Sequence, residues 1–159
     1  MLLWRISNHA DLSGEGGRRV AGRWHERGRP VVYLSEHAAL AFLENLVHLE
    51  IDPEDLPSKY QILTVEVPDS GIERLVESEL DRTAPGWRFD PTITRKLTAS
   101  WLGELRSLLL RVPSVLVPHS SNYLFNPLHA DASKAKIVRA DAANYDGRLF
   151  RAKPKPTES

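Results

Sequence analysis

Arginine and glycine are concentrated in the first thirty residues of the chain, where Arg23 lies between Gly22 and Trp24 in the stretch GRWHERGRPVVYLSE. Glycine allows a backbone to approach a ligand closely, and a guanidinium group can donate two parallel hydrogen bonds to a phosphate or a carboxylate. A buried tryptophan next to Arg23 would also hold that side chain in place. For any single arginine of this loop, exposure to solvent is the alternative, and it is the interpretation we favour for Arg27 and Arg29.

Two more polar side chains follow on the predicted elements downstream. Tyr33 lies near the end of the apolar run VVYLS, and Glu44 falls at the edge of the apolar face of the next predicted helix. Burial of a carboxylate without a partner is costly, so Glu44 is harder to explain by packing than Tyr33, for which a place in the core is the alternative. The end of the strand and the helix could therefore face one cleft.

The segment VPSVLVPHSSNYLFNP contains a serine after a proline and two asparagines around an aromatic residue, at Ser114, Asn122 and Asn126. Asparagine in a turn usually bonds to nearby backbone. Contact with a ribose or an amide of a ligand is the alternative, and we keep both interpretations.

The composition and the motifs that are absent narrow the chemistry. The chain has no cysteine, which excludes disulfides, thiolate metal sites and a cysteine nucleophile. It contains no HExxH, GxSxG or GxGxxG motif, and its six histidines are dispersed, so we predict no metal site. Lysine plus arginine and aspartate plus glutamate each number 21, so the charge balance gives no sign of a protein that coats nucleic acid or an anionic membrane.

With 159 residues, of which 42% are hydrophobic, the chain is predicted to form one compact domain over residues 1–150, followed by a polar tail, 151–159, that is predicted to be disordered. Predicted strands and helices are mixed without regular alternation, which favours an α+β fold. The N-terminal apolar run is too short for a signal peptide, and no segment reaches the roughly 20 apolar residues that span a bilayer. We therefore expect a cytoplasmic protein.

The elements predicted for the first third of the chain carry Arg5, Tyr33 and Glu44. Residues 2–6 are expected to form a strand, followed by a loop over 7–19 that is too irregular for a helix. A buried strand over 31–35 then leads into a helix over 36–51, with Ser35 as its cap. This helix would face the core with a stripe of Leu40, Leu43, Val47 and Ile51.

The remaining elements are predicted from the same patterns. A strand is expected over 59–69, and a surface connection with at most a short helix over 70–91. An amphipathic helix from about 92 to 110 would present a stripe of Leu97, Trp101, Leu105 and Leu108. A short strand interrupted by proline in VPSVLVP, a turn-rich asparagine segment and a last strand over 136–140 complete the prediction.

Taken together, these segments resemble the RES domain family, toxins of bacterial toxin–antitoxin pairs. The resemblance is carried by LWRIS, LSGEGGRRVAGRW, GRPVVYLS, AALAFLENLVHLE and VPSVLVPHSSNYLFNP, which occur in the family's order between residue 2 and about residue 150. It implies an ADP-ribosyltransferase-like mixed sheet with flanking helices, and NAD⁺ as a substrate with no prosthetic group. It also implies neutralisation by an antitoxin with an Xre-like helix-turn-helix domain that blocks the active site. Self-association of the toxin within that complex is a further expectation, whereas a membrane or direct nucleic-acid partner is not expected.

The family takes its name from an arginine, a glutamate and a serine, and a tyrosine is a fourth functional position; the matching residues are Arg23 in GRW, Glu44 in AFLE, Ser114 in VPS and Tyr33 in VVYLS. On this resemblance we predict that these four residues are catalytic. Arg23 would grip the pyrophosphate, and Tyr33 would pack on the nicotinamide or its ribose. Glu44 would orient the ribose and stabilise the positive charge that develops as the glycosidic bond breaks, and Ser114 would assist substrate contact.

Some assignments keep alternatives. Glu50 competes with Glu44, and Ser120 or Ser121 competes with Ser114. Additional substrate-binding residues are predicted at Arg5, Asn122 and Asn126. The acceptor of the ADP-ribosyl group stays open between water, phosphate and a protein side chain. Two rival functions are an ADP-ribosyltransferase that modifies a specific cellular protein and a non-catalytic module that binds nucleic acid or protein.

Overall fold

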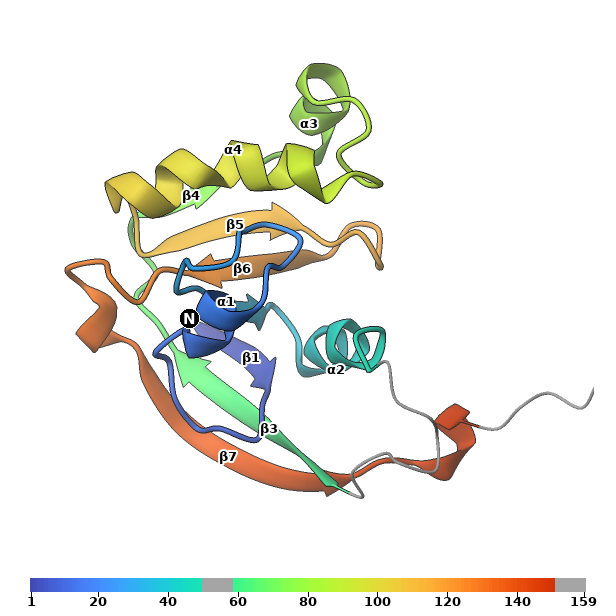
Figure 1. The fold of residues 1–159 in the computed structure, drawn as a ribbon. Helices are drawn as coiled ribbons and strands as arrows, with labels where there is room; N and C mark the ends of the chain where they lie inside the picture. Colours follow the sequence, from blue (N-terminus) through green and yellow to red (C-terminus); the bar gives the residue numbers. More distant parts are fainter. Residues whose placement is uncertain (50–58, 151–159) are drawn as a thin grey trace, which may run out of the picture.

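A computed structural model describes residues 1–49 and 59–150, and a mixed β-sheet runs through its centre (Figure 1). Within the described residues the sheet has seven strands in the order β4-β5-β6-β2-β1-β3-β7. The strands are β1 Leu2–Ile6, β2 Val32–Ser35, β3 Lys59–Glu66, β4 Ile72–Arg74, β5 Leu109–Pro113, β6 Ser121–Phe125 and β7 Lys136–Asn144. β4 and β5 are parallel, and the other neighbouring strands are antiparallel. The predicted α+β class is confirmed.

Short helices flank this sheet. The α-helices are α1 Glu15–Arg19, α2 Ala38–Leu46, α3 Glu77–Thr83 and α4 Pro91–Glu104, and two 3₁₀ turns are η1 Ala132–Lys134 and η2 Gly147–Phe150. In Figure 1, α3 and α4 lie at the end of the sheet formed by β4, β5 and β6, whereas α2 lies next to β1 and β2, which it contacts.

Alternation along β2 divides its side chains between two environments. Val32 and Leu34 belong to a buried cluster with Leu3, Leu63 and other side chains of neighbouring strands. Side chains on opposite faces of a strand alternate, so Tyr33 and Ser35 point to the other face. On that face, buried residues from β5 and β6 pack against α3 and α4 in a cluster with Trp24, Trp87 and Trp101.

The helix predicted from about 92 to 110 is shorter in the structure, because α4 ends at Glu104. Leu105 follows in the left-handed conformation, with φ 54°, which stops the helix. The apolar run that continues after it forms β5, which pairs with both β4 and β6. A short apolar run fits a helix or a buried strand equally well, and here the pairing partners decide between them.

The segment 121–125, predicted to be rich in turns, is the interior strand β6, and all five of its residues are buried. It pairs with β2 on one side and β5 on the other. Asparagine is unfavourable in most strands, but the Asn122 side chain is bonded to other side chains, which offsets its burial. Three further differences are the short helix α1 within the predicted loop 7–19, the strand β4 within the predicted surface connection 70–91, and the longer β7. The short helix that the prediction allowed in that connection is α3.

The helix that carries Glu44 also differs from its predicted extent. α2 begins at Ala38 with His37 as its N-cap, because Ser35 is the last residue of β2 and its hydroxyl bonds elsewhere. Of the predicted apolar stripe, Leu40 is buried and Val47 is half exposed. Leu43 is partly buried. The fourth residue of the stripe, Ile51, the rival glutamate Glu50 and the tail 151–159 lie outside the described residues.

Candidate active site

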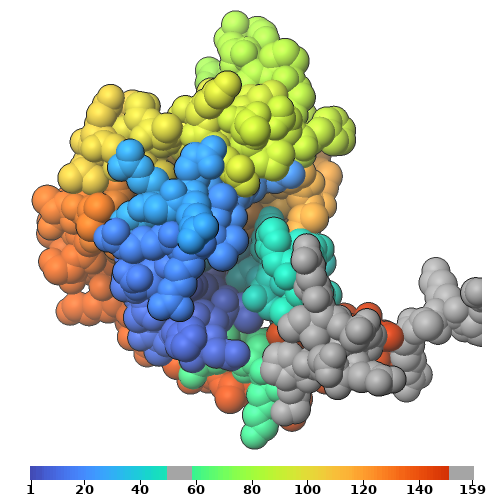
Figure 2. All heavy atoms as spheres, in the orientation of Figure 1, coloured from blue at the N-terminus to red at the C-terminus, as the bar shows by residue number. Residues whose placement is uncertain are grey.

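A cavity of about 680 Å³ opens between α2, the strands β1, β2 and β6, and residues 20–24. In the space-filling view, the surface is hollowed where α2, in cyan, faces the N-terminal segment, in blue (Figure 2). This volume is within the range of cavities that bind small molecules and cofactors. Side chains with polar or aromatic groups that line it include Trp4, Arg5, Arg23, Tyr33, Glu44, Asn45, His48 and Asn122.

The Glu44 carboxylate is held through one of its two oxygens. Its Oε1 accepts a hydrogen bond of 2.6 Å from the Asn122 side-chain amide and one of 2.9 Å from the Ser114 hydroxyl. The Ser35 hydroxyl in turn donates to Oδ1 of Asn122 at 2.7 Å, which orients the amide group. Within the described residues, Oε2 of Glu44 receives no protein hydrogen bond. The site therefore presents a fixed carboxylate with one oxygen available to a ligand.

Ser114 contacts Glu44 from behind and is not among the residues that line the cavity. Its hydroxyl donates to Glu44 and also accepts from the backbone N–H groups of Leu116 and Val117, at 3.2 and 3.1 Å. A hydroxyl has one proton and two lone pairs, so these three bonds use its full capacity. This geometry favours a role in holding Glu44 and the 114–117 turn over the predicted direct contact with substrate.

Tyr33 lines the cavity, and its hydroxyl is hydrogen-bonded within the protein. The hydroxyl oxygen accepts from the backbone N–H of Trp24 at 3.0 Å and lies 2.8 Å from Nδ1 of His25. Burial raises the pKa of the Tyr33 phenol well above its ordinary range, although the Trp24 hydrogen bond works in the opposite direction. The phenol is therefore neutral at physiological pH.

Arg5 and Arg23 bring two positive charges to the same cavity. Nη1 of Arg23 donates to the carbonyl of Trp87 at 3.3 Å, and Nη1 of Arg5 donates to the carbonyl of Asp11 at 3.0 Å. Neither guanidinium lies within 4.0 Å of a carboxylate oxygen in residues 1–49 and 59–150. Burial lowers the pKa of Arg5, yet arginine stays charged in proteins. The Asp11 carboxylate acts on Arg5 only from beyond that distance, and two cations without a close carboxylate partner favour an anionic ligand.

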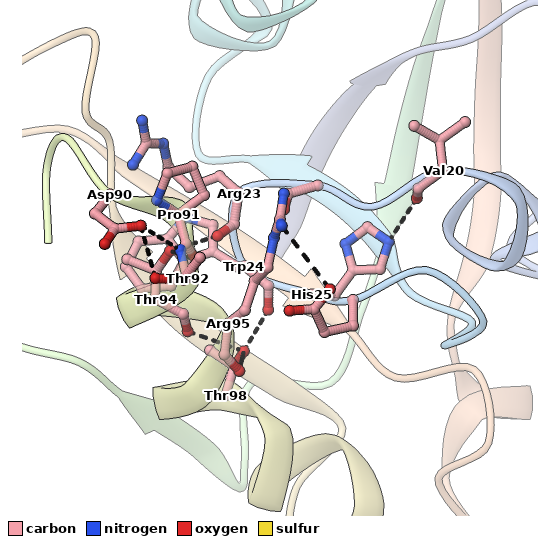
Figure 3. Close-up of polar contacts among 12 residues, drawn as sticks. Val20, Arg23, Trp24, His25, Asp90, Pro91, Thr92, Thr94, Arg95 and Thr98 are labelled. Atoms are coloured by element: carbon pink, nitrogen blue, oxygen red, sulfur yellow. Dashed lines mark hydrogen bonds and ion pairs between the residues drawn. The ribbon is translucent and has the colours of Figure 1, made fainter.

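Side chains of α4 hold the loop that carries Arg23, as Figure 3 shows. Nε of Arg95 donates to the carbonyl of Gly22 at 2.7 Å. The hydroxyls of Thr94 and Thr98 donate to the next two carbonyls along the chain, those of Arg23 and Trp24. Both threonines are fully buried. Three consecutive backbone carbonyls are thus fixed by one face of one helix, and this fixes the direction of the Arg23 side chain.

Replacement of Thr98 tests this contribution. The change Thr98→Val keeps the shape of the side chain but removes the donor to the Trp24 carbonyl, and we expect it to lower the free energy of unfolding by about 1–3 kcal/mol. Thr98→Ser keeps the hydroxyl, and we expect it to lower the free energy of unfolding clearly less than Thr98→Val does. Denaturant unfolding of the three proteins measures the difference, and equal stability of the Val and Ser variants would mean that the hydroxyl does not contribute.

The structure does not bring every predicted residue to the cavity. Asn126 is almost fully buried away from it, where its side-chain amide donates to the carbonyl of Leu102 at 3.3 Å and its Oδ1 accepts from the N–H of Leu128 at 3.1 Å. Asn126 therefore bonds backbone at the end of α4, as turn asparagines usually do. Arg27 and Arg29 are exposed, as the sequence predicts.

Four residues that the sequence analysis did not single out support the site: His25, Thr94, Arg95 and Thr98. Thr94 and Thr98 lie on the same face of α4 as the buried Trp101, at helical spacing. Polar residues on this buried face are the pattern from which the sequence could have indicated their role. The pairing of His25 with Tyr33 had no signal in the sequence pattern. Within the described ranges no three His, Cys, Asp or Glu side chains are grouped as metal ligands would be. No helix in these ranges is long and apolar enough to cross a membrane.

Comparison with known proteins identifies the family of the chain. The RES domain matches residues 2–147. A protein named "Toxin Res" from Pseudomonas putida KT2440 is 50% identical over 150 residues, which cover 94% of this chain and 100% of that protein. A protein named "Prs ADP-ribosylating toxin" from Sphingobium sp. strain YBL2 is 35% identical over 156 residues, which cover 93% of this chain and 96% of that protein.

A solved structure extends the likeness to the fold. The crystal structure of the M. tuberculosis MbcT–MbcA toxin–antitoxin complex contains a chain that matches with a TM-score of 0.72 and 18% identity, over 94% of this chain and 86% of that one. At this identity the match shows a shared fold. Together with the match of the RES domain to nearly the whole chain, these relatives show that the protein belongs to the RES domain family of toxins.

Proposed function

We propose that this protein is the toxin of a toxin–antitoxin pair and that it cleaves the bond between nicotinamide and ribose in NAD⁺. The observation that carries the proposal is a single cavity in which a carboxylate with one available oxygen, Glu44, lies together with two cations, Arg5 and Arg23. NAD⁺ has a pyrophosphate that suits the cations and a ribose whose anomeric carbon becomes positive when nicotinamide leaves. The site supplies opposite charges for these two parts of one molecule.

The reaction requires little proton transfer by the protein. The bond between C1 of the ribose and the nicotinamide nitrogen breaks with its electron pair going to nicotinamide, which leaves as a neutral molecule. The ribose becomes oxocarbenium-like, and a fixed carboxylate such as Glu44 stabilises that charge in the way that glycosidases use one. Attack by water gives ADP-ribose and a proton, and attack by phosphate gives its 1-phosphate. Neither a metal nor an activated nucleophile is required.

The other residues of the cavity serve binding and orientation in this proposal. Arg5 and Arg23 bind the pyrophosphate, because each guanidinium can donate to phosphate oxygens. Tyr33 packs its ring against the nicotinamide or its ribose. Ser35, Asn122 and Ser114 act through Glu44 as positioning residues, because they hold its Oε1 from the protein side.

The test is an assay of the wild-type protein freed of antitoxin. Purified protein is mixed with NAD⁺, and nicotinamide release is followed with and without phosphate. We expect nicotinamide in both cases, with ADP-ribose as the product of hydrolysis and its phosphorylated form as the product of phosphorolysis. Absence of nicotinamide release under both conditions contradicts the proposed activity. Salt-sensitive binding of nucleic acid without any turnover would instead support a non-catalytic module.

A second candidate is transfer of ADP-ribose to a specific cellular protein, and the relative from Sphingobium named as a Prs ADP-ribosylating toxin favours it. Both reactions begin with the same departure of nicotinamide and differ only in the acceptor. Mass spectrometry of proteins from cells that express the toxin would show added ADP-ribose in the second case. Loss of cellular NAD⁺ without modified protein supports the first.

We further propose that an antitoxin with an Xre-like domain covers the cavity. Support comes from the matching chain of M. tuberculosis, which was solved in a toxin–antitoxin complex. Exposed apolar side chains at the mouth of the cavity, Val20, Val47 and Leu116, give such a partner a surface to bury. Growth arrest on expression of the toxin alone, relieved by its antitoxin, is the expected result. A homodimer within the complex stays a prediction, which the mass of the purified complex would test.

A further inference from the structure

His25 is a buried histidine next to the site, and its hydrogen bonds define its protonation state. Its side chain is 3% exposed. Nε2 lies 3.0 Å from the carbonyl oxygen of Val20 and 3.2 Å from that of Gly17, and Figure 3 shows the ring directed toward Val20. A carbonyl oxygen can only accept, so Nε2 must carry a proton. In the neutral imidazole, Nδ1 is then a lone-pair acceptor.

The lone pair at Nδ1 of His25 determines the direction in which the Tyr33 O–H group points. The Tyr33 hydroxyl lies 2.8 Å from Nδ1 and already accepts from the backbone N–H of Trp24 at 3.0 Å. Because Nδ1 of the neutral ring has a lone pair and no proton, the hydroxyl donates its proton to His25. With one bond given and one received inside the protein, the phenol proton points toward His25, which is not among the residues that line the cavity, whereas Tyr33 is one of them.

We propose that His25 is a positioning residue for Tyr33: as a neutral imidazole with its proton on Nε2, it accepts the Tyr33 proton and fixes the ring that contacts the substrate. The inference rests on the proposed function for its consequence in catalysis. It means that Tyr33 contacts the ligand through its ring and that its hydroxyl does not donate a proton to the ligand. The carbonyls of residues 17 and 20 accept from Nε2 and so fix the tautomer, and Nδ1 on the other side of the ring then accepts from Tyr33.

The glycines of the loop support this assignment. A Cβ at Gly22 would lie 2.5 Å from the Tyr33 hydroxyl and 2.8 Å from Nδ1 of His25. A Cβ at Gly17 would lie 3.0 Å from Nε2 of His25 and 2.6 Å from the carbonyl oxygen of Arg29. Both positions are closed to a side chain by the protein's own structure. The glycines therefore let the backbone approach the His25–Tyr33 pair, whereas the sequence suggested an approach to a ligand.

Charged groups around His25 come from several elements. Burial lowers the pKa of His25 most strongly, and Arg95 of α4 lowers it further. The carbonyls of Gly17 and Val20 and the carboxylate of Glu26 on its own loop raise the pKa of His25. Protonation would give Nδ1 a proton, and the Tyr33 oxygen would then face two donors. The oxygen could accept from both, but the Tyr33 proton would then have no acceptor at His25, so protonation removes the hydrogen bond that fixes it.

The sign of the pH effect on stability follows from this arrangement. The pKa of His25 is lower in the folded protein than in the unfolded chain, so the unfolded chain binds the proton more readily. The neutral imidazole contributes its full stability above the ordinary histidine pKa of about 6.5, and that stability is lost progressively as the pH falls below this value. Melting temperatures should therefore fall between pH 7.5 and 5.5 more in the wild type than in a variant without an imidazole at this position.

The direct test is the tautomer of His25 in the wild-type protein. In ¹⁵N-labelled protein at pH 7.5, long-range ¹H–¹⁵N correlation spectra are expected to show a protonated Nε2 and an unprotonated Nδ1 for His25. A proton on Nδ1, or a charged ring, overturns the inference. This measurement needs no turnover, so it decides the inference even if the wild type releases no nicotinamide and the proposed function fails.

Variants test the consequence for catalysis. His25→Asn places an amide oxygen near the position of Nδ1 and cannot titrate, so we expect it to keep most of the turnover and to lose the decline of activity that protonation of His25 causes in acid, at a pH lower than the ordinary histidine pKa. His25→Leu removes the acceptor and is expected to lower kcat by about 10²-fold, because the ring of Tyr33 is no longer fixed. The exposed His9, changed to Asn, is the matched control and should behave as the wild type. Equal kcat for His25→Leu and wild type, with both folded by circular dichroism, would contradict the positioning role.

Discussion

A Glu44→Gln variant is expected to release nicotinamide from NAD⁺ about 10²–10³-fold more slowly than the wild type, with the fold intact. Glutamine has the shape of glutamate, and its amide oxygen can accept the same hydrogen bonds from Asn122 and Ser114. Its NH₂ group then occupies the place of Oε2. The cavity would present a neutral donor where the wild type presents a negative charge, so the oxocarbenium-like state loses its stabilising partner. The measurement is kcat from initial rates of nicotinamide release.

A matched control for this variant is Glu36→Gln. Glu36 also bonds to β6, since its Oε1 accepts from the backbone N–H of Ser121 at 2.7 Å, but it is not among the residues that line the cavity. Its replacement removes one carboxylate near the same strand without changing the proposed active site, and kcat should stay within a few-fold of the wild type. Wild-type turnover by Glu44→Gln would exclude Glu44 as the charge-stabilising residue.

The change Gly22→Ala is expected to have the second large effect. The added methyl group would lie 2.5 Å from the Tyr33 hydroxyl, closer than van der Waals contact allows, and both Tyr33 and His25 are held by other bonds. Overpacking of this kind costs about 1–3 kcal/mol of stability. Displacement of the Tyr33 ring should also lower kcat by about 10²-fold. Denaturant unfolding and nicotinamide release measure the two effects separately.

Gly16→Ala is the control in the same glycine-rich stretch. No atom lies within 4 Å of a Cβ at Gly16, which belongs to α1, so alanine should be tolerated and even favoured there. We expect wild-type activity and unchanged or slightly higher stability. If Gly22→Ala matches Gly16→Ala in both measurements, the contact between the loop and the His25–Tyr33 pair is not tight in solution.

The strands β1, β2 and β3 and the helix around Glu44 could be predicted from the sequence because their patterns are local. Leu2–Ile6 and Val32–Ser35 are apolar runs bounded by polar loops, and such runs form strands whatever they later pair with. The motifs around Arg23, Tyr33 and Glu44 could be recognised for the same reason, since each lies on or beside one of these elements. The structure brings all three to one cavity.

The contacts of the two asparagines and the structure of the apolar segment after α4 depend on residues far away in the sequence. Asn122 and Asn126 look alike in the sequence, yet Asn122 faces β2 and bonds Glu44, 78 positions away, whereas Asn126 bonds the end of α4. The residues Leu109–Pro113 became a strand because β4 and β6 lie on either side of them. Local propensity is weaker than such pairing, so the pattern alone could not distinguish these outcomes.

The sequence therefore determined which residue types were available for the chemistry: an arginine, a tyrosine and a glutamate on predictable elements, in a chain without cysteine. The tertiary structure determined how each of them is held. The threonines of α4 reach the carbonyls of Arg23 and Trp24 across 71 and 74 positions of the chain, and Ser114 reaches Glu44 across 70. A hydrogen bond depends on distance and direction in space, which residue types and their spacing along a chain do not specify.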